Sequence, residues 1–132
     1  MKYTLIIQSS PSEHQGSETG LRFARSLLKQ NHEIVRLFFY STGVYSANDA
    51  AVAPQDEQNL TSDWQALIQE FNLDAVVCIA AAVRRGVITH RESQRYGKTH
   101  NTLSDSTELS GLGQLISASI ESDRVLTFGG RS

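Results

Sequence analysis

Cys78 is the only cysteine in the chain, and its thiolate form would be a nucleophile. It follows the apolar residues 75–77 and precedes the small residues 80–82, after which come Arg84 and Arg85. If a strand ends near Cys78 and a helical turn follows, free backbone N–H groups and the two arginines would stabilise the thiolate. A lone cysteine in an apolar strand is nevertheless most often a small buried hydrophobe. The local sequence alone therefore favours an unreactive Cys78.

The loop between residues 9 and 20 is a second candidate for chemistry, because serine, threonine and glycine make up much of it. Such a loop before a helix is typical of phosphate-binding sites in flavodoxin-like proteins. It matches neither the Walker A pattern nor GxGxxG, however. We therefore interpret it as an ordinary turn with a helix N-cap. A flavodoxin-like module that binds a phosphate or a cofactor is the alternative from a different functional class.

The four histidines are His14, His32, His90 and His100. None of them pairs with another at a metal-ligand spacing, and one cysteine cannot supply a zinc cluster. We interpret them as surface or loop residues, although a histidine distant in sequence can still serve as a base for Cys78. The sequence predicts neither a metal site nor a bound cofactor.

Four short apolar runs alternate with segments of helical spacing. The apolar runs are 3–7, 34–40, 75–83 and 125–128, and the helical segments are 21–28, 60–71 and 109–120, with a capping box at 89–92. Continuous apolar runs are typical of strands buried on both faces, as in a parallel sheet. We therefore expect a single-domain α/β fold with an open, mostly parallel sheet and helices on both faces. Chemistry in such folds takes place at the carboxyl ends of the strands.

Composition narrows the class of protein. The chain has 132 residues, of which 39% are hydrophobic and 20% charged, and its formal charge is −2. These values exclude a disordered tail, a membrane protein and a strongly basic nucleic-acid-binding domain, but they leave room for a local basic patch. The apolar run at the N-terminus is too short for a signal peptide or a membrane span. We expect a cytoplasmic protein that makes no contact with membranes.

Aromatic and apolar residues also cluster where the second apolar run ends. The cluster comprises Phe38, Phe39, Tyr40, Val44 and Tyr45. These side chains belong either to the core or to the rim of a protein interface. Because they exceed what a small domain needs in a loop region, we expect them to take part in a contact with another subunit.

Several stretches of the sequence together resemble a known family. They are residues 37–40 with 43–48, 78–87, 109–115 and the terminal strand 122–128. In order and with similar spacing, they resemble the DsrE-type sulfurtransferase subunits, which include TusD, from residue 1 to about residue 128. The resemblance implies that residues 1–132 form one DsrE-like domain, with a DsrEFH-like sheet related to the flavodoxin type.

The resemblance also reverses the interpretation of Cys78. The family carries sulfur as a cysteine persulfide, and its active cysteine stands immediately before the small-residue run that ends in Arg-Arg-Gly. This position corresponds to Cys78, with Arg84 and Arg85 as supporting residues. The family needs no metal or cofactor for this reaction. A further hypothesis is that this chain is a structural subunit and that a paralogue carries the active cysteine.

The resemblance implies partners and a pathway as well. It implies a hetero-oligomer with TusB- and TusC-like subunits, a TusA-like protein as sulfur donor and a TusE-like protein as acceptor. The sulfur would serve the 2-thiolation of wobble uridine in tRNA, with no direct binding of nucleic acid by this chain. A DsrE-type role beside DsrF and DsrH in dissimilatory sulfur oxidation is the alternative pathway.

Overall fold

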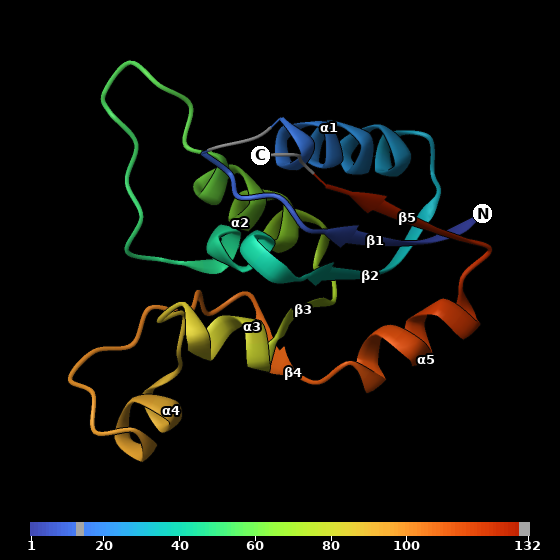
Figure 1. Cartoon of the computed structure of the whole chain (residues 1–132). Helices are drawn as coiled ribbons and strands as arrows, with labels where there is room; N and C mark the ends of the chain where they lie inside the picture. Colours follow the sequence, from blue (N-terminus) through green and yellow to red (C-terminus); the bar gives the residue numbers. More distant parts are fainter. Residues whose placement is uncertain (13–14, 130–132) are drawn as a thin grey trace.

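The computed structural model describes residues 1–12 and 15–129, which form a five-stranded parallel sheet with the strand order β4-β3-β2-β1-β5 (Figure 1). The strands are β1 (Lys2–Ile7), β2 (Glu33–Phe39), β3 (Ala75–Cys78), β4 (Glu108–Ser110) and β5 (Arg124–Phe128). The helices are α1 (Gly16–Lys29), the 3-10 helix η1 (Ser41–Ala47), α2 (Leu60–Phe71), α3 (Ile79–Arg84), α4 (His90–Arg95) and α5 (Gly113–Glu121). The predicted parallel α/β sheet is confirmed.

The order of the strands explains where the helices lie. Strands β1 to β4 follow one another in one direction across the sheet, whereas β5 lies on the other side of β1. The chain must therefore cross back between β4 and β5, and right-handed crossovers place that connection on the opposite face. Helices α1 and α2 accordingly cover one face of the sheet, while α5 lies on the other (Figure 1). The prediction of helices on both faces is confirmed.

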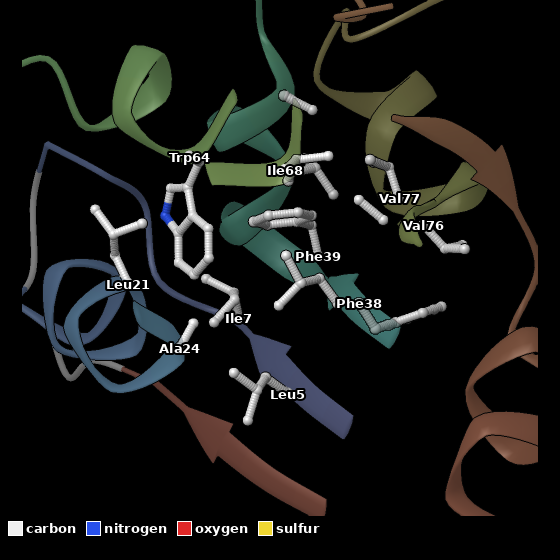
Figure 2. Close-up of a cluster of buried hydrophobic side chains, with 14 of the residues drawn as sticks. Leu5, Ile7, Leu21, Ala24, Phe38, Phe39, Trp64, Ile68, Val76 and Val77 are labelled. Atoms are coloured by element: carbon white, nitrogen blue, oxygen red, sulfur yellow. The ribbon is translucent and has the colours of Figure 1, made fainter. Parts of the chain in front are cut away.

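Strand β1 shows why the apolar runs have little alternation. Leu5 and Ile7 are fully buried on the side of α1 (Figure 2). Thr4 is also fully buried but faces α5, where its hydroxyl donates a hydrogen bond to the carbonyl of Ala118 at 3.3 Å. Both faces of the strand are therefore covered, as is usual in parallel sheets.

Trp64 is the largest side chain of the core and joins three elements. Its ring meets that of Phe39 edge-on, with the ring centroids 5.4 Å apart, so α2 packs on β2 (Figure 2). Its indole N–H donates a hydrogen bond to the hydroxyl of Ser17 at 2.9 Å and thereby satisfies its one polar group. This contact joins α2 to α1 across the buried side of the sheet.

The third apolar run changes conformation halfway. Only residues 75–78 form a strand, and residues 79–84 form helix α3. The apolar pattern continues through both because the first turn of α3 still packs on the core through Ala81 and Ala82. Hydrophobicity alone cannot mark this boundary.

Strand β4 and the start of α5 differ from the prediction. The helical spacing of residues 109–120 predicts a helix from Leu109, whereas residues 108–110 form an edge strand and the helix begins at Gly113. Leu109 is half-buried against the core from its place in the strand. Three residues are too few to show a period of two, so only pairing with β3 reveals this strand.

The apolar face predicted for α5 is not buried. Leu112, Ile116 and Ile120 are 48%, 62% and 80% exposed. The helix instead turns Leu115 and the small Ala118 towards the sheet. The exposed residues follow one another four apart and form one stripe along the helix, which we call the apolar stripe. No helix within residues 1–12 and 15–129 is long and apolar enough to cross a membrane.

The prediction that residues 38–45 form a contact surface is wrong for three of its five side chains. Phe38, Phe39 and Val44 are fully buried, and only Tyr40 and Tyr45 are half-buried. Strand β2 lies in the middle of the sheet, and η1 packs directly against its end, so these side chains belong to the core.

Gly43 allows the close packing of η1, and we predict that Gly43→Ala destabilises the fold by about 3 kcal/mol. A Cβ atom at this position would lie 1.9 Å from the carbonyl oxygen of Ile7, which belongs to the backbone and cannot rotate away. Gly113→Ala is the matched control, because a Cβ atom there has no neighbour within 4 Å. The control should change stability by no more than about 0.5 kcal/mol. Urea unfolding measures both values, and equal effects would contradict the packing described here.

Candidate functional site

Cys78 lies at the point where β3 becomes α3. It is the last residue of the strand and pairs with Ser110 of β4, and its extended backbone (φ −61°, ψ 117°) makes it the N-cap of the helix. The predicted position at the carboxyl edge of the sheet is therefore confirmed. The side chain is 3% exposed and makes no capping hydrogen bond.

A surface pocket of about 490 Å³ opens over this thiol. Its lining includes Cys78, Arg84, Arg85, Tyr40, Ser41 and Leu112. The structure thus brings the three predicted site residues to one pocket. The carboxyl ends of β2, β3 and β4 meet there, because neighbouring parallel strands end at the same edge of a sheet.

The two arginines are held differently. Arg85 is half-buried, and its guanidinium donates a hydrogen bond to the carbonyl of Ala81 in its own helix at 2.9 Å. Arg84 is exposed, and no residue that the structure describes accepts a hydrogen bond from its side chain. Neither arginine forms an ion pair, since Arg36–Asp74 is the one ion pair among the described residues. Both therefore contribute positive charge to the pocket without a direct bond to the thiol.

Sequence reasoning missed Ser41 and Leu112 as neighbours of the thiol. Ser41 follows the second apolar run. Because neighbouring parallel strands end at the same edge of the sheet, the sequence could have placed it near Cys78. Ser41 has φ +53°, a left-handed conformation that is uncommon for residues other than glycine and is found preferentially near functional sites. The sequence could not place Leu112 near Cys78, because its position depends on strand β4, which is too short to be recognised from its pattern.

The loop between residues 9 and 20 borders a different pocket, of about 650 Å³. Glu18 and Glu57 line this pocket, and the lining residues include no lysine or arginine. Two carboxylates without a cation disfavour a phosphate at this place. The expected side-chain cap is also wrong, because α1 begins after Gln15, whose side chain makes no capping hydrogen bond. Residues 13 and 14 lie outside the described residues.

The histidines do not converge on the thiol. A ring nitrogen of His32 lies 3.1 Å from the N-terminal amine, His90 begins α4, and His100 contacts Thr99. None of these three lines the pocket of Cys78, and His14 lies outside the described residues. Within the described part of the chain, no group of three or more histidine, cysteine, aspartate or glutamate side chains could hold a metal ion.

Comparison with known proteins shows which family the chain belongs to. The sequence profile of the DsrE/DsrF-like family matches residues 1–128. This chain belongs to the DsrE/DsrF-like family. It is 46% identical to a sulfurtransferase TusD homologue of Pseudomonas aeruginosa, over 98% of each chain. It is 40% identical to the putative sulfurtransferase DsrE of Allochromatium vinosum, over 98% of this chain and 99% of that protein.

The fold of the DsrE/DsrF-like chain also agrees with a solved structure. The ychN protein of E. coli superposes with a TM-score of 0.77 and 24% sequence identity, over 97% of this chain and all of that one. This likeness bears on the fold alone. The names of the full-length relatives indicate sulfurtransferase activity in the family.

The positive charge of the pocket should be measurable at the only thiol. We predict that Arg84→Glu lowers the ratio of alkylation rates for anionic iodoacetate and neutral iodoacetamide about three- to tenfold, because a cation at the pocket attracts the anionic reagent. Intact mass follows the reaction, since Cys78 is the only cysteine. Arg124→Glu changes the same charge outside the pocket and should leave the ratio unchanged. Equal changes in both variants would mean that Arg84 has no local effect on the thiol.

Proposed function

We propose that this chain is a sulfurtransferase subunit whose Cys78 accepts sulfane sulfur as a persulfide and passes it on. The observation that carries the proposal is the place of the one thiol, at the carboxyl end of β3 in a pocket that two arginines also line. In open parallel sheets, ligands bind at this edge. Membership of the family and the sulfurtransferase names of full-length relatives support the same conclusion.

The proposed reaction is an exchange between thiols. The Cys78 thiolate attacks the outer sulfur of a persulfide on the donor protein, so a new S–S bond forms at Cys78 while the donor's S–S bond breaks. The donor leaves as a thiolate. The proton on the transferred outer sulfur then passes to the donor thiolate, which leaves the persulfide on Cys78 as an anion. An acceptor thiolate then attacks the outer sulfur on Cys78 in the same way. Sulfur moves without net oxidation or reduction, so neither step needs a further reactant.

The surroundings of Cys78 suit a persulfide intermediate. No second cysteine in the chain can attack the persulfide and discharge it as an intrachain disulfide. The next residues, Ile79 and Ala80, are exposed, and the alanine is small enough for another polypeptide to approach the pocket closely. The thiol itself is nearly buried, which protects it from oxidation between transfers.

We place this activity in the cytoplasmic relay for 2-thiolation of tRNA wobble uridine. A TusA-like donor would load Cys78, and a TusE-like acceptor would unload it. The 46% identity to a TusD homologue supports this pathway. The 40% identity to a DsrE protein of similar length supports the second candidate, a subunit in dissimilatory sulfur oxidation. Both candidates use the same chemistry at Cys78.

The chain is proposed to act in a hetero-oligomer with TusB- and TusC-like subunits. The apolar stripe of α5 supports this assembly, because three large apolar side chains on one side of a short helix favour burial against a protein. Leu112 begins the stripe and also lines the pocket of Cys78. A subunit that covers the stripe would therefore lie next to the site of transfer.

The persulfide itself is open to direct measurement. Incubation with a small persulfide donor should add the mass of one sulfur atom to the wild-type chain, and a reductant should remove it. Cys78→Ser should gain nothing, because the side chain that carries the sulfur is missing. Ser41→Ala is the control within the same pocket and should keep the adduct. An adduct on the Cys78→Ser variant would contradict the proposal.

Assembly can be tested separately. We predict that Ile116→Asp weakens the complex with co-expressed TusB- and TusC-like subunits at least tenfold in dissociation constant, because the carboxylate would have to be buried without a partner. Val52→Asp is the control, since Val52 is 88% exposed in the connection before α2. Light scattering of the purified complexes measures the effect. Intact complexes with both variants would mean that another surface holds the subunits together.

A further inference from the structure

Positive charge is concentrated in the segment that follows the thiol. Residues 84–100 contain five arginines and lysines and a single carboxylate, Glu92, whereas the whole chain has a formal charge of −2. The rest of the chain is therefore strongly acidic. A segment of opposite sign in an acidic protein forms a local field that a partner can recognise.

These charges are exposed and not neutralised. Arg84, Arg91, Arg95 and Lys98 are all exposed, and together we call them the basic surface. None of them pairs with a carboxylate among the described residues. Glu92 does not compensate for them, because it is buried and bound within its own helix turn.

The predicted helix start with Thr89 as N-cap is confirmed, although Glu92 binds the hydroxyl of Thr89 and not its backbone N–H. The hydroxyl of Thr89 accepts a hydrogen bond from the backbone N–H of Glu92 at 3.3 Å and donates one to its carboxylate at 2.7 Å. The side chain of Glu92 is thereby turned inward, with 8% of its surface exposed. The single acidic residue of the segment therefore stabilises the start of α4 and leaves the outer side of α4 cationic.

Residues 88–102 form a closed loop that contains α4 and lies beside the pocket in the sequence. It is closed at its base, where the backbone N–H groups of Thr102 and Leu103 both donate to the carbonyl of Ile88, at 2.9 and 3.0 Å. It carries α4 out beyond α3, away from the sheet (Figure 1). Arg84 itself lines the pocket, so the basic surface begins there, and only residues 85–89 separate Arg84 from α4.

We infer that the basic surface docks an acidic surface on the protein whose cysteine exchanges sulfur with Cys78. The inference rests on the proposed function, because it assigns the docking surface for that exchange. A protein partner suits the site better than RNA, since apolar Ile79 and Leu112 lie on the pocket and the remaining chain would repel phosphates. Tyr96, the one phenylalanine, tyrosine or tryptophan of residues 84–100, already lies against the guanidinium of Arg95, at 5.5 Å.

Exposed charges of this kind act mainly on the rate of encounter and on the choice of partner. Their effect falls as salt screens them, over about 8 Å at physiological ionic strength. The signature of the basic surface is therefore a preference for acidic partners that depends on salt.

Two peptides can measure this preference at Cys78. Each carries one cysteine, flanked by glutamates in one peptide and by glutamines in the other, and activated as a mixed disulfide with 2-thiopyridine. The Cys78 thiolate attacks the peptide sulfur, the S–S bond of the reagent breaks, and 2-thiopyridone leaves and is detected by its absorbance. The ratio of the two rates removes the effect of the limited exposure of the thiol. In the wild-type chain at low salt it should favour the acidic peptide about tenfold, and it should approach one at high salt.

Charge reversal locates the effect. Arg91→Glu/Arg95→Glu should abolish the preference, whereas Arg22→Glu/Lys29→Glu on α1 should keep it. The two double variants are matched, since each changes two exposed cations, one of them in the last turn of a helix. Circular dichroism checks the fold, and Arg91→Gln/Arg95→Gln replaces the first variant if it does not fold.

Several results would overturn the inference. They are equal rates for the two peptides, no reaction with either, or an equal loss of preference in both double variants. Binding of fluorescent poly(U) RNA to the wild-type chain, lost in the Arg91/Arg95 variant and without any peptide preference, would assign the surface to nucleic acid instead. The assay involves no persulfide, so it can succeed or fail independently of the sulfur adduct on Cys78.

Discussion

Strand β3 is held between β2 and β4 in parallel register, and this pairing decides where the thiol lies. Cys78 pairs with Ser110 of β4, and Val77 with Phe39 of β2, so the three strands end together. Ser41 and Leu112 are each the second residue after a neighbouring strand, and both line the pocket with Cys78. The backbone turns into α3 immediately after Cys78, which brings Arg84 and Arg85 to the same pocket. Each feature of the site therefore follows from the common carboxyl edge.

The same topology leaves one face of the sheet lightly covered. The return crossover to β5 supplies a single helix of nine residues, and only Ala118 of that helix is buried. Its apolar stripe stays exposed and begins at the pocket with Leu112, and the basic surface begins at the same pocket with Arg84. In the proposed function, the stripe serves lasting assembly with other subunits and the basic surface serves brief encounters with sulfur carriers. Apolar burial suits the first role and screened charge the second.

The sequence predicts β1, β2 and β3 well, because most of their residues are apolar and covered on both faces, and it also predicts the edge strand β5 from its short apolar run. It also places Cys78 correctly at a strand end and predicts the helix start at Thr89. Prediction from the sequence fails for the elements whose position depends on tertiary contacts. The edge strand β4 is too short to show a period, and the rotation of α5 depends on the small Ala118 fitting against the sheet. Phe38 and Phe39 suggest an interface in the sequence, but their strand lies in the middle of the sheet.

The central claim is that sulfur passes through Cys78 on its way between proteins. Single-turnover transfer of radioactive sulfur from a persulfide-loaded donor protein to an acceptor protein, through the assembled complex, tests it most directly. The label should appear on Cys78 before it reaches the acceptor, and it should leave Cys78 at the rate at which the acceptor gains it. Cys78→Ser should block both steps while the complex stays intact. Arrival of label on the acceptor at the full rate in the Cys78→Ser complex would contradict the account.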